Sequence, residues 1–314
     1  MNIKKIIFDT DIGGDCDDAG ALAIIHEAVN RKYARLLAVT VSTRDPWACG
    51  CADAINRYYG NNVPVGLCAR APLGDPTVAE FLERYGKHIA ENYENNYLQR
   101  PAECSLGGGF ECPERAVPLM RRLLAAEKGE KITLVVVGSC LNLADLLNSE
   151  GDGHSPLSGL ELVEAKVDKV VLMGGLFAEN ATPEYNIKTD VPSAEAVFEK
   201  CPVPIFISHF DVGLRVMSGG RLLMEAPENP AAEAYRFHVG GKRHSWDPIA
   251  AFYAIYGSFG VFSDKRRGKV TVLDDGVTVF KEGDGMHTLI DCDDRDVSAA
   301  EVLLDAAMSG EIKI

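Results

Sequence analysis

Short runs of Val, Ile and Leu alternate along the first two thirds of the chain with longer segments whose apolar residues recur at helical spacing. The runs predict six strands, over Ile6–Phe8, Leu36–Val41, Val63–Leu67, Ile132–Val137, Val167–Met173 and Val203–Ile207. The longer segments predict five helices, over Asp18–Val29, Ala48–Tyr59, Glu114–Ala126, Leu141–Leu147 and Ser193–Lys200. Nearly continuous apolar strands are typical of a parallel sheet buried on both faces. The pattern therefore predicts an α/β fold with a mostly parallel central sheet flanked by helices.

The last third of the chain has a different pattern. It predicts three helices, over Pro230–His238, Pro248–Tyr256 and the closing segment Val297–Met308. Two β-branched runs flank Asp274-Asp275-Gly276, which is typical of a tight turn, so a small hairpin is expected over Val270–Leu273 and Val277–Phe280. There is no repeat and no linker, and residues 1–314 are expected to form one domain. Residues 71–112 have weak periodicity and are interpreted as a lid or loop excursion.

The formal net charge of −14 over 314 residues narrows the classes of partner. An acidic chain repels nucleic-acid backbones and anionic membranes, so neither is expected, and a neutral small molecule or a cation fits better. No apolar run is long enough to span a bilayer. Asp9 and Asp11 interrupt the apolar N-terminal run too early for a signal peptide. Nine scattered cysteines, an odd number, favour a reducing compartment, so a cytoplasmic location is expected.

An unusual density of carboxylates follows the first predicted strand. Residues 9–18 contain five aspartates and open the next helix. Clustered carboxylates repel one another unless a cation or protons intervene, and hard oxygen ligands favour Ca²⁺ or Mg²⁺. One alternative is a solvated acidic loop with Asp15 or Asp17 as a helix cap. Another is a haloacid-dehalogenase-type phosphatase with Asp9 as nucleophile, although Ile12-Gly13-Gly14 does not continue that motif.

Five motifs in order along the chain resemble those of the inosine-uridine nucleoside hydrolases. They are Asp9-x-Asp11-x-Gly13 with Asp17-Asp18-Ala19, then Gly138–Ala144, Met173-Gly174-Gly175, Asn180–Ile187 and Ser245-Trp246-Asp247-Pro248. The resemblance covers nearly the whole chain and implies a nucleoside-hydrolase-like fold. It also implies a Ca²⁺-dependent enzyme that hydrolyses the N-glycosidic bond of nucleosides to free base and ribose, and that forms a homodimer or homotetramer.

The resemblance also implies a role for each matching residue. Asp11, Asp18, Asp247 and the Leu141 carbonyl would bind Ca²⁺, and Asp11 would take the proton of a calcium-bound water. Ribose would contact Asp17, Asn180, Glu184 and Asn186, while Asp9 and Asn142 would support the ligands from behind. Simpler roles are open: Asn142 could cap the helix at 141–147, and Asp247 could cap one that starts at Pro248.

The chain departs from the family pattern in three places. Asp15 is extra, because the spacing from Asp11 to Asp17 is longer by two residues, and the spacing from Asn180 to Glu184 is shorter by two. Trp246 replaces the histidine that protonates the departing base in many members. Trp246 and Asp45 on the base side suggest a purine preference, with His238, His244 or no residue as the leaving-group acid. No basic cluster surrounds the motifs, so phosphorylated substrates are expected to react poorly. A noncatalytic calcium- and ribosyl-binding protein is the remaining alternative.

Overall fold

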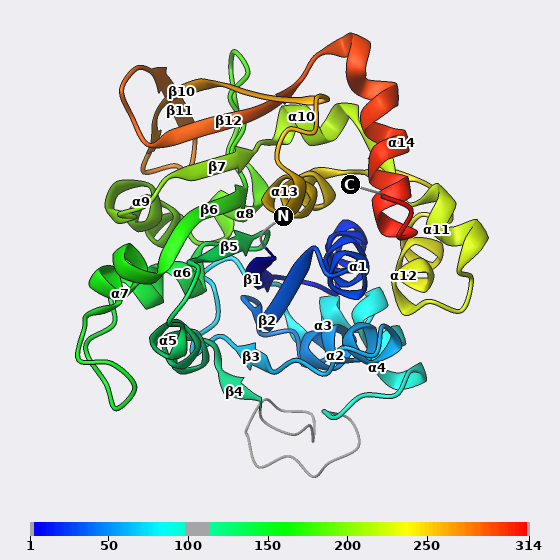
Figure 1. Ribbon diagram of the computed structural model, residues 1–314. Coiled ribbons are helices and arrows are strands. Elements are labelled where there is room, and N and C mark those ends of the chain that lie inside the picture. The colour runs from blue at the N-terminus through cyan, green and yellow to red at the C-terminus, as the bar shows by residue number, and fades with distance from the viewer. Residues whose placement is uncertain (1–2, 98–112, 313–314) are drawn as a thin grey trace.

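The computed structural model describes residues 3–97 and 113–312 and is built around one ten-stranded sheet (Figure 1). The strand order is β11-β10-β12-β7-β6-β5-β1-β2-β3-β4. The seven strands from β7 to β4 run parallel, β12 joins β7 in parallel, and β10 and β11 add an antiparallel edge. Their bounds are β1 Lys4–Thr10, β2 Ala34–Val41, β3 Val65–Leu67, β4 Glu114–Arg115, β5 Ile132–Val136, β6 Val167–Met173, β7 Ile205–Ser208, β10 Phe262–Val272, β11 Thr278–Glu282 and β12 His287–Cys292.

Helices cover both faces of the sheet (Figure 1). Successive residues of a strand point to opposite faces, so the apolar central strands present a hydrophobic surface to the helices on each side. Ile6 and Phe8 of β1 belong to one buried cluster, and Ile7 between them belongs to the other. The first cluster is completed by α1 Asp17–Asn30, α2 Ala48–Tyr58, α4 Tyr85–Asn92, α10 Phe210–Arg215, α11 Gly220–Glu225, α12 Pro230–His238, α13 Trp246–Tyr256 and α14 Val297–Met308. The second is completed by α5 Ala116–Ala126, α6 Leu141–Leu147, α7 Gly159–Lys166, α8 Tyr185–Thr189 and α9 Val191–Lys200.

The structure confirms the predicted α/β class and all six predicted strands, with ends that differ by up to two residues. The C-terminal hairpin is present as β10 and β11, and α14 has the predicted bounds. Strand β12 was missed, although it fills the position between β10 and β7. Three helix starts were wrong by two residues: α5 begins at Ala116 because the two residues before it pair with β3, α9 begins at Val191, and α13 begins at Trp246.

The segment at 71–112 is more ordered than its weak periodicity predicts. Its described part contains α3 Val78–Phe81, which begins with a Thr77–Glu80 capping box, and α4. Residues 98–112 of the predicted excursion lie outside the described residues. The described part of this segment is therefore partly helical rather than entirely loop.

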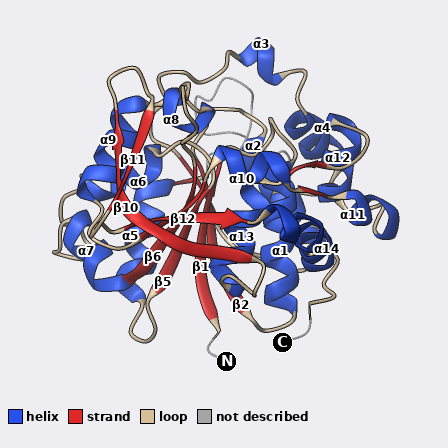
Figure 2. Ribbon diagram, turned by 90° about the horizontal axis from the view of Figure 1, so that it is seen from above, coloured by secondary structure: helices blue, strands red, loops and turns tan. Residues whose placement is uncertain are grey.

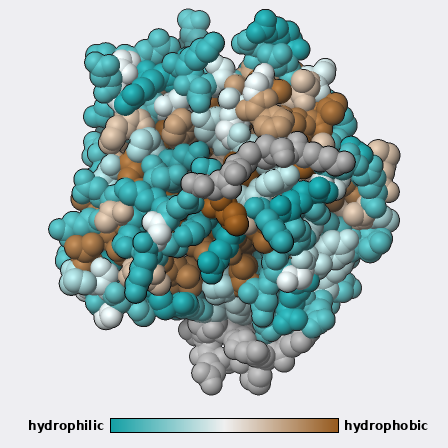
Figure 3. Space-filling model, viewed as in Figure 1, coloured by the Kyte–Doolittle hydropathy of each residue, from teal (hydrophilic) through white to brown (hydrophobic). Residues whose placement is uncertain are grey.

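Parallel strands place the loops that follow them at one edge of the sheet, where ligands commonly bind. In Figure 2 the strands rise from the N-terminus, and α3 and α8 lie beyond their carboxyl ends. A separate two-stranded ribbon, β8 Met217–Ser218 with β9 Arg243–His244, leads directly into α13. On the face seen in Figure 3, hydrophilic side chains predominate and hydrophobic ones form small patches. None of the helices in the described ranges is long and apolar enough to cross a membrane.

Candidate active site

A cavity of about 670 Å³ opens at the carboxyl ends of the strands. One part of its wall is acidic and comes from the turn after β1 and the first turns of α1 and α13. Another part is aromatic and comes from α10, α12 and α13. Side chains of the segment between α3 and α4 and of α8 complete the lining. The cavity thus joins the segments that carry the sequence motifs.

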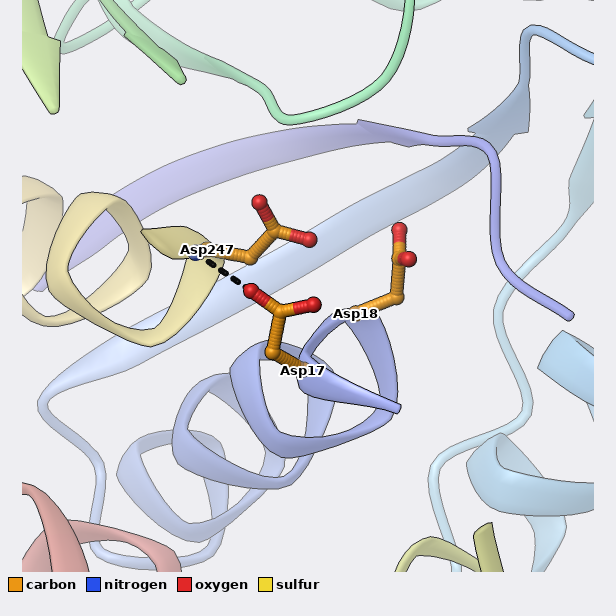
Figure 4. A group of neighbouring side chains, drawn as sticks. All are labelled: Asp17, Asp18 and Asp247. Atoms are coloured by element: carbon orange, nitrogen blue, oxygen red, sulfur yellow. Dashed lines mark hydrogen bonds between the residues drawn. The ribbon is translucent and has the colours of Figure 1, made fainter. Parts of the chain in front are cut away.

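Three buried carboxylates meet in this cavity. Asp17 and Asp18 lie in the first turn of α1, and Asp247 lies in the first turn of α13, which packs against α1. One oxygen of each carboxylate lies within 4.8 Å of the others. The backbone N–H of Asp247 donates to Asp17 Oδ2 at 3.1 Å (Figure 4). Thr10 donates its hydroxyl hydrogen to Asp18. Asp247 is inside the helix rather than at its cap, so the cap interpretation is wrong.

Burial raises the pKa of Asp17, Asp18 and Asp247 well above the usual value, and repulsion among the neighbouring carboxylates raises it further. Burial also raises the pKa of Asp11 to about 7. Without a cation these groups would hold protons near neutral pH, whereas a divalent cation would favour their ionised forms. A cluster of carboxylate oxygens is the donor set that suits Ca²⁺ or Mg²⁺. The residues present therefore fit a hard divalent cation.

The predicted ligand set is only partly gathered. Asp11 lines the same cavity and adds to the repulsion felt by the three clustered carboxylates, but it is not a member of the 4.8 Å group. Asp17, predicted to bind ribose, has its carboxylate within that group. Leu141 is fully buried at the start of α6 and is not among the lining residues. Val137, just after β5, lines the cavity.

Glu184 and Asn186 line the cavity from the start of α8. Glu184 caps this helix, because its Oε1 accepts the N–H of Asn186 at 3.0 Å and its Oε2 accepts the N–H groups of Gly175 and Ile187 at 3.1 and 3.3 Å. Asn186 Nδ2 donates to the Val137 carbonyl at 2.7 Å. These bonds fix both side chains at the ends of β5 and β6.

Asn180 is not brought to the site. It lies at an exposed turn with a φ of 60° and is not among the lining residues.

Asp9 and Asn142 form a buried network beneath the turn after β1. Asp9 Oδ2 accepts hydrogen bonds from Thr40 Oγ1 at 2.6 Å and Asn142 Nδ2 at 2.7 Å, and burial raises its pKa to about 7. The Asn142 amide also donates to the Val41 carbonyl at 3.1 Å, so Asn142 does not cap α6. Asp9 does not line the cavity and is 1% exposed, which is incompatible with a nucleophile that must reach substrate.

Trp246 lines the cavity but is already in contact with several groups. Its indole N–H donates to the Phe210 carbonyl at 3.0 Å, and the two rings stack at 5.4 Å. The Arg243 guanidinium lies 5.1 Å from the indole centroid, and His244 lies at 5.1 Å. Little of the indole face is therefore left for a base.

The extra Asp15 holds Arg243, whose Nε lies 2.9 and 3.0 Å from the two carboxylate oxygens. His238 Nε2 lies 3.4 Å from the same carboxylate and lines the cavity. His244 does not line it, and its Nδ1 is buried without a described partner. Asp45 is 2% exposed, accepts the Trp47 N–H at 2.8 Å, and also stays out of the lining.

Comparison with known proteins agrees with this arrangement. The model of the inosine-uridine preferring nucleoside hydrolase family matches residues 6–307. The chain belongs to this family. Two curated relatives of the nucleoside hydrolase are pyrimidine-specific ribonucleoside hydrolases RihA. That of Shewanella sp. strain MR-4 is 30% identical over 73% of this chain and 67% of its own length, and that of Enterobacter sp. strain 638 is 37% identical over 72% and 67%.

The solved structure of an inosine-uridine preferring nucleoside hydrolase from Bacillus anthracis shares the fold, with a TM-score of 0.69 at 17% identity over 99% of this chain and 100% of that one. Family membership and the buried position of Asp9 together argue against the alternative of a haloacid-dehalogenase-type phosphatase. The chain is thus an enzyme of the nucleoside hydrolase class.

Several lining residues of this nucleoside hydrolase were not predicted. Tyr185 directly follows the motif residue Glu184, and Phe210 comes two residues after the end of β7, so their positions in the sequence could have indicated them. Arg84 and Tyr85 come from the 71–112 excursion, where no motif marks them. The lining also contains two arginines, Arg84 and Arg243, although the motifs themselves indicated no basic cluster.

Proposed function

We propose that the protein is a Ca²⁺-dependent ribonucleoside hydrolase that cleaves the N-glycosidic bond and releases free base and ribose. The observation that carries the proposal is the group of three buried carboxylates, from two different helices, at one cavity with Glu184 and Asn186. Family membership supplies the reaction class.

Asp11, Asp18 and Asp247 would hold the cation together with the Leu141 carbonyl, and Asp17 would lie between the cation and ribose. When bound, Ca²⁺ would bind the ribose diol and lower the pKa of a water molecule. Asp11 accepts the proton that the attacking water loses, because it lines the cavity beside the cluster. Asp9 and Asn142 keep the strand end that carries Asp11 in position through their buried hydrogen bonds.

Glu184 and Asn186 orient the ribose. Positive charge develops on the ribosyl ring as the C1′–N bond breaks, and the surrounding carboxylates stabilise that charge. The hydrogen bonds that already fix Glu184 and Asn186 mean that little reorganisation is needed in the transition state.

The base lies toward Phe210, Phe237, Trp246 and His238. His238 is the leaving-group acid in this proposal rather than His244, because only His238 of the two lines the cavity. The purine preference expected from Trp246 and Asp45 stays a prediction. Its basis is weaker than the sequence suggested, because Trp246 contacts Phe210, Arg243 and His244, Asp45 is outside the lining, and the relatives named above are pyrimidine-specific.

The test is base release from inosine, adenosine, guanosine, uridine and cytidine, and from 2′-deoxyuridine, after EDTA treatment and after addition of Ca²⁺ or Mg²⁺. We expect release from ribonucleosides only, restored best by Ca²⁺. Binding of ribonucleosides without release of any base would favour the noncatalytic calcium- and ribosyl-binding alternative. The cytoplasmic location and the homodimer or homotetramer also stay predictions.

A further inference from the structure

The cavity contains a basic side chain that forms no ion pair with a carboxylate of the described residues. Arg84 and Arg243 both line the cavity, and Arg243 is held by Asp15 at 2.9 and 3.0 Å. Within residues 3–97 and 113–312, the Arg84 guanidinium has no carboxylate at ion-pair distance. A cation is therefore presented to whatever occupies this part of the cavity.

Uncharged neighbours hold Arg84 in place. Its guanidinium carbon lies 5.1 Å from the centroid of the Phe81 ring, and its positive charge partly offsets the raised pKa of the Tyr185 hydroxyl, which lines the same cavity. A Cβ on Gly14 would lie 2.8 Å from Arg84 Nη1, so the glycine leaves room for the guanidinium against the aspartate-rich turn. The side chain is half-buried and is flanked by the Phe81 ring and by Gly14, and such packing preorganises an arginine for recognition.

These contacts place Arg84 at the ribose end of the cavity. Tyr185, whose pKa Arg84 influences and which lines the cavity with it, directly follows Glu184, whereas the aromatic rings assigned to the base come from α10, α12 and α13. With the ribose diol at the carboxylate cluster and the base at the aromatic wall, the C5′ substituent remains for the side of Glu184 and Tyr185. Asn180 does not occupy that side, because it lies outside the lining.

We propose that Arg84, with Tyr185, forms a subsite for a phosphate on ribose C5′, so that nucleoside 5′-monophosphates are substrates as well as nucleosides. The inference rests on the proposed ribonucleoside hydrolysis and reverses the expectation that phosphorylated substrates react poorly. A guanidinium binds phosphate through paired, charge-assisted hydrogen bonds. In the reaction, a water oxygen bonds to C1′, the C1′–N electron pair leaves with the base, and the base gains a proton. The products are ribose 5-phosphate and free base, with no oxidation or reduction.

Two carboxylates near Arg84 also line the cavity, Glu80 and Glu83. Glu80 accepts the Thr77 N–H at 2.8 Å and the Thr77 hydroxyl hydrogen at 2.7 Å in the capping box, and Arg84 acts on it as a nearby charge without forming an ion pair. Arg84 also partly offsets the raised pKa of Asp11 and Asp45. A pure charge-balancing role for Arg84 would affect phosphorylated and unphosphorylated ligands equally, which separates it from a phosphate subsite.

The matched pair of variants is Arg84→Gln and Arg44→Gln. Arg44 also offsets the raised pKa of the nearby Asp75, as Arg84 does, but it is not among the lining residues. Calorimetric titration of the Ca²⁺-loaded protein with ribose and with ribose 5-phosphate gives the ratio of their affinities. Values of kcat/KM for uridine with uridine 5′-monophosphate, and for inosine with inosine 5′-monophosphate, give the corresponding kinetic ratios.

We expect the wild type to bind ribose 5-phosphate at least about tenfold more tightly than ribose, and Arg84→Gln to lower that ratio about 10- to 100-fold, as for a hydrogen bond to a charged group. The kinetic ratios should fall with it, and Arg44→Gln should keep all of them. Equal binding of the two sugars by the wild type, or an equal loss for both in Arg84→Gln, would overturn the subsite. Preference for ribose 5-phosphate without release of any base would support the subsite while refuting the hydrolase proposal.

Discussion

Replacing Asp247 by Asn tests whether the clustered carboxylates repel one another when no cation is bound. Oxygens of Asp17, Asp18 and Asp247 lie within 4.8 Å of one another. Two full charges at that separation repel by about 3.5 kcal/mol at an effective dielectric constant of about 20. Proton binding relieves part of this repulsion, because the pKa of each group is raised. Asp247→Asn keeps the shape of the side chain and leaves the backbone N–H that Asp17 accepts.

In EDTA at pH 7.5, we expect Asp247→Asn to raise the free energy of unfolding by about 2–4 kcal/mol, roughly the repulsion of one pair. That gain corresponds to an increase in Tm of about 3–6 °C for a chain of this size. A carboxyl whose pKa is raised by folding is least costly below its unfolded pKa, near 3.8, and destabilises the fold increasingly as the pH rises toward its folded pKa. The stabilisation by Asp247→Asn should therefore be small at pH 4.5 and large at pH 7.5.

Scanning calorimetry at both pH values in EDTA measures this difference, and titration with Ca²⁺ measures affinity. Ca²⁺ should bind Asp247→Asn at least about 100-fold more weakly, since loss of a ligand exceeds the 10- to 100-fold effect of its supporting contacts. Asp284→Asn, at an exposed position outside the cavity lining, is the control. A lower Tm for Asp247→Asn in EDTA at pH 7.5, or unchanged Ca²⁺ affinity, would refute the electrostatic account.

Three further predictions concern the substrate. Glu184→Gln should cost about 1–3 kcal/mol of stability and lower kcat/KM at least about tenfold, because the NH2 group that replaces one carboxylate oxygen cannot accept the backbone N–H groups bound there; unchanged thermal stability and kinetics would contradict this. His238→Gln should lower kcat about 10²- to 10⁴-fold while His244→Gln stays near the wild type, and equal rates for all three proteins would remove the acid role from His238. Trp246→Ala should lower the purine-to-pyrimidine ratio of kcat/KM; a wild type that prefers uridine, or a ratio that Trp246→Ala leaves unchanged, would end the stacking explanation.

The parts of the fold that were predictable are those where local sequence and burial agree. The first strand and its neighbours are continuous apolar runs because both faces of the sheet are covered. The clustered aspartates were visible because carboxylates at such density need a cation or protons. Motif order then indicated Glu184, Asn186 and Asp247, all of which line the cavity.

The rest depends on contacts between distant segments. Strand β12 has a short apolar stretch, and its place follows from pairing with β7 and β10 rather than from its own pattern. The ion pair of Asp15 with Arg243 spans 228 positions in the chain. Arg84 lies in a segment of weak periodicity, and only the folded chain sets it beside Gly14 and Tyr185. Asn180 matches the family motif in residue type, yet the folded chain leaves it outside the cavity lining.

Release of free base from ribonucleosides by the Ca²⁺-loaded protein, compared with Asp11→Ala, tests the central claim most directly. The account predicts that the wild type releases base and ribose from at least one of inosine, adenosine, guanosine, uridine and cytidine. It predicts that Asp11→Ala, at a Ca²⁺ concentration that saturates it, loses at least about 10²-fold in kcat, as expected for removal of a general base. Near-normal turnover by the Ca²⁺-saturated Asp11→Ala protein, or no base release by the wild type, would contradict the account.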